Sequence, residues 1–517
     1  NLKLDTDVTI AMDTHDLTVT DETDINGTIT ISTATLDVNG SFDATGGFVT
    51  FTDAGNLNLE STVTDLGTLS DNFGTVTYDG IDQTVFSDIY YNLTAGGGSG
   101  TKTLGGSVTV ANDLTIDTDV TISMDTHPLT VTNATDIDGT LAVADNTLTL
   151  DGTSDVDGTI TISTGTVDAN SAFDATNGTI TFTDAGNLNL DSTVTSLGTL
   201  SDNFGTVTYD GVDQAVFSDD YYSLTAGGGS GTKTFGGDVT VANDLIIDTD
   251  VTIAMDSYDL TVTNATDIDG TLAVSANILT LNGASDVDGT ITISTGTVDA
   301  NGTFTAEGGT ITFSAAGNLM LASTVTDLGT LSTNFGKVTY NGTAQTIFAD
   351  TYYDLTVANS NTKTLGGNLV VARDLTIDAG VTLDVSSNDY SINVARNFAN
   401  SGTFTMQDGL VTFDGNDDQA FTSGGSSFYA ITYNNGGGAD KTLSVNGTLT
   451  MTNNLIVTAG TIDLDSFDPS VNLAGDLTIA NAAIWTRGSG TLTFNGTSQT
   501  FTDNNGSPNN LGDIIID

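Results

Sequence analysis

Pairs of aspartates separated by a single residue recur along this chain of 517 residues, and they are the side chains best suited to chemistry. Such pairs return at a fixed interval, as from Asp136 to Asp155. Stacking at that interval would place like carboxylates about 5 Å apart, with a repulsion on the order of 1 kcal/mol per pair in water that hydration, splaying or a cation would relieve. Ca²⁺ suits sites built from carboxylate and carbonyl oxygens in turns. The candidate ligands are Asp136, Asp138, Asp155, Asp157, Asp267, Asp269, Asp286 and Asp288.

Solvated turn carboxylates are the favoured interpretation of these pairs, and structural calcium is the alternative. The sequence Asp-x-Asp-Gly lacks the downstream Glu of a helix-loop-helix calcium site, and the Gly-Gly-x-Gly-x-Asp nonapeptide array is absent. We therefore expect that the protein requires no cofactor, with calcium as the candidate metal.

Clustered carboxylates could also serve an enzyme, such as a polysaccharide lyase or hydrolase. A catalytic site is unique in its chain, whereas nearly every acidic cluster here is present in two or three copies. His15 and His127 occupy equivalent places, and Tyr258 takes that place in the next copy, which weakens a role in proton transfer. The unrepeated Trp485-Thr486-Arg487 is better explained by packing than by a sugar site. We predict no catalytic residues.

Lysines and tyrosines fall at fixed points of the repeat and are candidates for contacts. Four lysines each precede Thr and then Leu or Phe, so we expect lateral or internal ion pairs that specify register or contact, because an exposed pair contributes only about 0–1 kcal/mol. For the Tyr-Tyr pairs, a lateral contact or protruding edge and a core-filling role are equally favoured. The candidate interface residues are Lys102, Lys233, Lys363, Lys441, Tyr90, Tyr91, Tyr221, Tyr222, Tyr352 and Tyr353.

A block of about 131 residues recurs nearly verbatim, and Tyr78, Tyr209 and Tyr340 mark the same point in three copies. The first copy lacks about 19 residues yet resumes in phase, which indicates stackable pieces of that length and therefore a solenoid. The repeats are residues 1–113, 114–244, 245–374 and a diverged region at 375–517, all in one continuous solenoid. We call this point, a Tyr or Phe followed by Asp-Gly or Asn-Gly, the landmark of the repeat. In the diverged region it returns at Phe413 and Phe494, at spacings of 73 and 81 that we interpret as about four coils each.

The landmark combines a turn with a glutamine. Asp79-Gly80 supplies a positive-φ turn, and Gln83 follows it at a fixed distance. We expect this Gln to hydrogen-bond the backbone at a corner, with ligand binding as the alternative.

Apolar residues alternate with Thr in short runs such as Thr159-Ile160-Thr161-Ile162, each bounded by Gly, Asn or Asp. A period of two with β-branched residues predicts strands whose Ile, Val and Leu share one face. Stacked coils would pair their edges in parallel ladders. We predict an all-β parallel β-helix with coils of about 19 residues, right-handed coils being favoured. About 27 coils at about 4.8 Å would form a rod on the order of 130 Å long.

The composition excludes several partners. A net charge of −57 with a pI near 4.1 would repel nucleic acid and anionic lipid. Cys is absent, so disulfides and thiolate metal sites are excluded. No apolar run approaches the length that a membrane-spanning helix needs, and we expect no membrane insertion. These features favour an extracellular or cell-surface location.

Both ends of the chain read as strands of a repeat, without a polar cap. We expect either a segment of a longer protein or a protomer that joins copies of itself head to tail. The candidate end contacts are Leu2, Leu4, Ile514 and Ile516.

Three runs carry a family resemblance: GTVTYDG at 74–80, YYNLT at 90–94 and GTKTLGG at 100–106. They resemble the repeats of large bacterial surface proteins with parallel β-helix folds, such as filamentous-haemagglutinin-like adhesins and autotransporter passengers. The resemblance implies export, a rod-like form, and adhesion or matrix building.

We therefore expect a non-catalytic extracellular β-solenoid, as a subunit or segment of a fibre, sheath or filament. The alternative is the stalk of a surface adhesin that binds host or matrix ligands. A lesser alternative is a rod that binds ice or a surface polysaccharide through rows of Thr.

Overall fold

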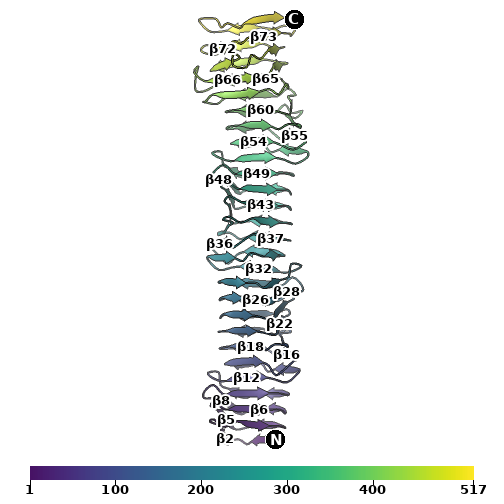
Figure 1. Ribbon diagram of the computed structural model, residues 1–517, viewed down its shortest axis with the longest axis vertical. Helices are drawn as coiled ribbons and strands as arrows, with labels where there is room; N and C mark the ends of the chain where they lie inside the picture. The colour runs from purple at the N-terminus through teal and green to yellow at the C-terminus, as the bar shows by residue number, and fades with distance from the viewer. The chain divides into compact units, whose positions relative to one another are not determined.

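The computed structural model describes residues 1–517 and contains 75 strands and no helix, hence no helix able to cross a membrane. The strand pairs within it are parallel, so the predicted all-β fold and parallel β-solenoid are confirmed. The chain divides into two compact units, Asn1–Ala254 and Met255–Asp517, which we describe separately. In each unit, short strands stack one above another in successive coils (Figure 1).

One coil consists of three strands, each in a different ladder. In unit 1, β21 (Thr135–Ile137), β22 (Thr140–Val143) and β23 (Thr147–Leu150) form one coil. The next coil is formed by β24 (Ser154–Val156), β25 (Thr159–Ile162) and β26 (Thr166–Ala169). Each strand of the first coil pairs with its equivalent in the second, and Asp136 opposes Asp155. The interval between these two aspartates is therefore one coil, which confirms the coil length predicted from the sequence.

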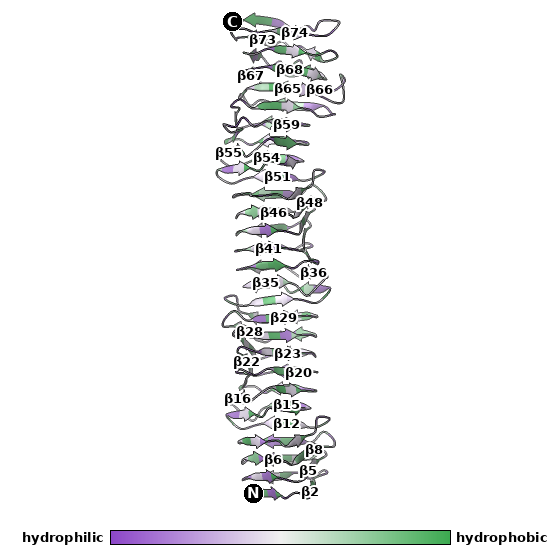
Figure 2. Ribbon diagram, turned by 180° about the vertical axis from the view of Figure 1, so that it is seen from behind, coloured by the Kyte–Doolittle hydropathy of each residue, from purple (hydrophilic) through white to green (hydrophobic).

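The alternation of Thr with Ile, Val or Leu decides which residues enter the core. In β25, Ile160 and Ile162 are fully buried, while Thr159 and Thr161 lie half-buried on the outer face. The ribbon coloured by hydropathy shows the same mixture of hydrophobic and hydrophilic positions along the strands (Figure 2). Stacked apolar rows remove these side chains from water, while the ladders pair the backbone between coils.

The landmark of the repeat marks a place where two of the three ladders are interrupted. In unit 1, β10 (Val63–Asp65) ends one sheet and β11 (Thr68–Leu69) ends another. New sheets begin at β13 (Gln83–Val85) and β14 (Ile89–Tyr90). The ladder from β9 (Asn56–Leu59) through β12 (Thr75–Tyr78) to β15 (Asn92–Ala95) alone continues.

The same interruption occurs in the two later copies. In unit 1, the continuous ladder is β29 (Asn187–Leu190), β32 (Thr206–Tyr209) and β35 (Ser223–Ala226). In unit 2 it is β49 (Asn318–Leu321), β51 (Lys337–Tyr340) and β54 (Asp354–Val357). We call these places joint 1 (residues 56–104), joint 2 (187–235) and joint 3 (318–365).

Successive joints of unit 1 lie on different faces of the coil. Strand β32 comes twenty strands after β12, which is a step of six coils of three strands plus two further strands. Accordingly, the continuous ladder of joint 1 belongs to the sheet that contains β3 (Leu17–Val19), and that of joint 2 belongs to the sheet that begins at β14. A residue of joint 1 and its equivalent in joint 2 therefore lie on different faces of the coil.

The interpretation of the spacings 73 and 81 as whole coils is wrong. Tyr340, Phe413 and Phe494 lie in β51, β62 (Leu410–Phe413) and β73 (Thr491–Phe494), which are 11 strands apart and belong to three different sheets. Each spacing is thus three coils plus two strands. Coils in this region are longer than the coil between Asp136 and Asp155, since Val371 pairs with Val394.

Candidate functional site

The joints gather the most distinctive polar side chains of the sequence. An interrupted ladder leaves buried backbone N–H and C=O groups without strand partners, and such groups need other hydrogen bonds. The coil at joint 1 is also shorter than its neighbours, because Val76 already pairs with Leu93. Side chains of a Gln, a Tyr pair and a Lys supply the missing bonds at each joint.

Gln83 connects the turn of the landmark to the preceding coil. Its Oε1 accepts a hydrogen bond from the N–H of Gly80 (2.7 Å), and its Nε2 donates to the carbonyls of Leu59 (2.7 Å) and Ser61 (2.8 Å). Gln214, Gln345 and Gln499 make the equivalent three bonds, and Gln419 makes the two to carbonyls. The predicted corner role of the Gln is therefore confirmed.

A buried pair of tyrosines satisfies a second part of the same turn. Tyr90 Oη donates to the carbonyl of Phe86 (2.6 Å), so the hydroxyl of Tyr78 must donate to Tyr90 Oη (2.9 Å). Tyr78 Oη in turn accepts the N–H of Phe86 (3.0 Å). Burial raises the pKa of Tyr78 to about 12 and that of Tyr90 well above its usual range.

Joints 2 and 3 repeat this arrangement with Tyr209 and Tyr221, and with Tyr340 and Tyr352. The first residue of each Tyr-Tyr pair of the sequence is therefore a core residue, with no exposed surface. The lateral-contact alternative is wrong for Tyr90, Tyr221 and Tyr352, because inward alternation and the hydroxyl bonds place them inside. Tyr91, Tyr222 and Tyr353 are partly exposed and remain candidates for contact.

The repeated lysine is also buried. Lys102 lies in β16 (Gly100–Leu104), has no exposed surface, and its Nζ donates to the carbonyl of Gly80 at the landmark turn. Lys233 makes the same bond to Gly211, and Lys363 donates to Ser360 (2.8 Å). Burial lowers the pKa of all three amines, although nearby carboxylates oppose the shift for Lys102 and Lys233.

The expectation of ion pairs at an interface is therefore wrong for Lys102, Lys233 and Lys363. Each shares the inward parity of a core Leu or Phe that follows in its strand, and the amine pairs with backbone carbonyls instead of carboxylates. Lys441 differs, since its partly exposed side chain lies 3.9 Å from a carboxylate oxygen of Asp417, within the same chain.

The paired aspartates form exposed columns along the outer face. Asp136 opposes Asp155 in unit 1, and Asp267 opposes Asp286 in unit 2; these four residues and Asp138, Asp157, Asp269 and Asp288 are all exposed. Partial burial, followed by the neighbouring carboxylates, raises the pKa of Asp136 and Asp155. No group of three or more acidic or His side chains converges on one point. Calcium binding there stays a prediction.

The predicted end contacts differ in exposure. Leu4 is buried at 3% and Leu2 is half-buried, whereas Ile514 and Ile516 in β75 (Asp513–Ile516) are 49% and 85% exposed. Trp485, which was predicted to pack rather than to form a sugar site, is 4% exposed, and its packing in the core is confirmed.

The exposed phenylalanine that contacts Tyr91 at joint 1, and its equivalents at joints 2 and 3, were not predicted from the sequence. Phe73 and Tyr91 lie with ring centroids 6.2 Å apart, and the equivalent pairs are Phe204 with Tyr222 and Phe335 with Tyr353. The signal was present, because an Asn-Phe-Gly triplet precedes the landmark strand at the same point of all three regular copies.

Two shallow cavities adjoin these rings. A cavity of about 370 Å³ at joint 2 is lined by Tyr222, Thr206, Ser223, Asn243 and Asp244, among others. Its counterpart at joint 3 has about 290 Å³ and is lined by Phe335, Tyr353, Lys337, Asp354 and Arg373. A separate groove of about 830 Å³ lies at joint 1, where the ladder between β10 and β13 is interrupted. Glu60, Asp82 and Gln83 line it together with Ser, Thr and Val side chains.

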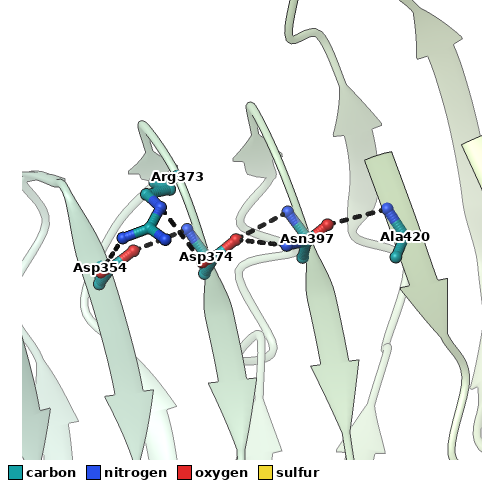
Figure 3. A network of polar contacts seen from close by, with 5 residues as sticks. All are labelled: Asp354, Arg373, Asp374, Asn397 and Ala420. Atoms are coloured by element: carbon teal, nitrogen blue, oxygen red, sulfur yellow. Dashed lines mark hydrogen bonds and ion pairs between the residues drawn. The ribbon is translucent and has the colours of Figure 1, made fainter. Parts of the chain in front are cut away.

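A column of Asx side chains fixes the corner beside the joint 3 cavity (Figure 3). Asp354 Oδ1 accepts the N–H of Asp374 (3.1 Å), Asp374 Oδ1 accepts that of Asn397 (3.3 Å), and Asn397 Oδ1 accepts that of Ala420 (2.9 Å). Arg373 bridges Asp354 and Asp374 at 3.1 and 3.4 Å and lies over the ring of Tyr353. The walls of the cavity are therefore held in place by neighbouring coils.

Comparison with known proteins gave no match to any family model, any curated protein or any solved structure.

Proposed function

We propose that this chain is a non-catalytic structural element of an extracellular fibre, sheath or filament. The observation that carries the proposal is that the distinctive buried side chains of the repeat bond the backbone of their own solenoid. A ligand site would keep such groups available, whereas a structural element uses them to hold adjacent coils together. The proposed mechanism is mechanical, with ladders that give stiffness and an apolar interior that gives stability.

The net charge of −57 supports an extracellular role in which like-charged copies resist lateral clumping. The resemblance to β-helix surface proteins supports the same location. A stalk that displays an adhesive region is the alternative function. The half-exposed aromatic pairs of the joints support this alternative, because they are surfaces that a ligand could contact.

Electron microscopy of the purified 517-residue chain tests the assembly that we propose. End-to-end filaments would support a polymerising subunit, with the exposed edge of β75 as one contact surface. Matched variants Ile514→Lys and Ile278→Lys separate this edge from general surface hydrophobicity, because both isoleucines are 49% exposed. Loss of filaments in the first variant alone supports the edge contact, and isolated particles in the parent protein refute polymerisation in favour of a stalk.

A further inference from the structure

The exposed aromatic pairs of the joints are exceptions to the pattern that sends large apolar side chains inward. Phe73, Phe204 and Phe335 are 47%, 48% and 50% exposed, and each ring lies tilted against a Tyr of the same joint. The exception recurs with the same geometry in all three copies. A ring that fills no core position and recurs in this way is available to contact another molecule.

The surroundings of the rings define the chemistry of that molecule. At joint 2 the cavity combines the ring of Tyr222 with the hydroxyls of Thr206 and Ser223 and with the Asn243 amide. At joint 3 Arg373 lies over the ring of Tyr353, so the 50% exposed ring of Phe335 is the open aromatic wall. Asp354 and Arg373 stand beside it and are held in place by the Asx column (Figure 3). A sugar ring presents apolar C–H faces and a rim of hydroxyls, which match an aromatic wall with polar side chains at its edge.

Charge selects among the ligands that have such faces. The chain carries a net charge of −57, and Asp244 is the charged side chain that lines the cavity at joint 2, whereas at joint 3 Asp354 lies beside Lys337 and Arg373. An anionic polymer or a second copy of this chain would meet like charge at the surface. We propose that the exposed aromatic pairs of the joints bind neutral polysaccharide. The proposal does not rest on the fibre role, because a stalk would carry the same pairs.

The rotation between joints determines how many polysaccharide chains one molecule can reach. In unit 1, Phe73 precedes β12 in one sheet and Phe204 precedes β32 in another, so the two aromatic pairs lie at different corners of the coil. One extended polysaccharide running along a single face cannot occupy both. One molecule therefore offers corners at which two separate polysaccharide chains could be held, and the viscosity measurement below tests such cross-linking.

Affinity electrophoresis of the full chain tests the binding. The gels contain hydroxyethylcellulose, a soluble β-glucan or soluble starch, with alginate as the polyanion. The test variant combines Phe73→Ala, Phe204→Ala and Phe335→Ala, and the matched control is Phe48→Ala, because Phe48 is 48% exposed and lies outside the joints. We expect at least one neutral polysaccharide to retard the parent and the control, with binding at least about tenfold weaker in the triple variant.

Two outcomes would overturn the proposal: no retardation by any neutral polysaccharide, or equal retardation of the parent and the triple variant. Concentration-dependent self-association that the triple variant loses would instead assign the aromatic pairs to contacts between copies. For cross-linking, we expect the parent to raise the viscosity of the retarding polysaccharide, and a variant that keeps only Phe204 to bind without doing so. Filament formation is scored separately, so failure here leaves the structural role intact.

Discussion

Replacing one buried glutamine with glutamate isolates the contribution of a joint to stability. Gln214 is 7% exposed, and its Nε2 donates to the carbonyls of Leu190 (2.8 Å) and Ser192 (2.5 Å). In Gln214→Glu the same position holds a carboxylate oxygen, which faces two carbonyl oxygens with no proton between them. An uncompensated buried charge of this kind destabilises a protein by about 3–5 kcal/mol.

Hydrogen exchange followed by mass spectrometry measures the effect where it arises, because solenoids open locally. We expect peptides within residues 206–235 to lose protection by roughly two to three and a half orders of magnitude at pH 7. Joints 1 and 3 keep their own Gln and serve as controls in the same molecule. Val212→Glu places the same charge on the 64% exposed Val212 of the same turn and should leave protection unchanged.

The effect should depend on pH with a defined sign. Burial and the two carbonyls raise the pKa of the new carboxyl in the folded state above its unfolded value. The protonated form donates one hydrogen bond and still accepts the N–H of Gly211, so protection should be greatest below the unfolded pKa and fall as the pH rises through the folded one. Unchanged protection of residues 206–235 at pH 7 would refute the claim that the Gln replaces a missing ladder.

Three further predictions follow from the same structure. The folded-state pKa of Tyr78 is raised to about 12, so the stability that this residue contributes, about 3 kcal/mol, is present below pH 10 and is lost between pH 10 and 12. The β-strand signal in circular dichroism should therefore disappear as the joint tyrosines ionise, and ionisation near pH 10 without unfolding would contradict this. Asp136→Asn with Asp155→Asn should raise the midpoint of thermal unfolding, because partial burial and then the neighbouring carboxylates raise the pKa of both carboxyls, a destabilisation that is relieved as the pH falls. The part due to repulsion should shrink at high salt, and an equal effect at both salt concentrations would argue against repulsion. Deleting residues 136–154 should leave a folded protein, because it removes one whole coil and the ladders still meet in register. Deleting residues 136–145 removes only part of a coil and should prevent folding. Equal solubility and β-content of the two deletion variants would count against coils of the proposed length.

The fold could be predicted because its determinants are local and repeated. Alternation of Thr with β-branched residues fixes strands and their inward face, and the step from Asp136 to Asp155 fixes the length of a coil. The corner role of Gln83 followed from its fixed place after a Gly turn. None of these inferences required knowledge of distant contacts.

The joints could not be predicted, because they depend on ladders that fail to form. Strands β10 and β13 each pair on one side only, and alternation along their sequences does not show that the other side stays without a partner. For Lys102 a usable signal was present, since it shares the parity of the buried Leu104, yet its charge favoured an outward position. The carbonyls of Gly80 and Ile81 that receive the amine become known only with the turn itself.

The two extra strands between the landmarks of unit 1 have a consequence for how such a gene can change in length. Recombination between near-identical copies adds or removes a block that runs from one landmark to the next, which in unit 1 is 20 strands. Because that number is whole, the ladders on both sides of the new junction still meet in register. Because it is not a multiple of three, every corner beyond the junction turns to a new face. A single duplication would thus preserve the fold while re-orienting all surface features downstream of it.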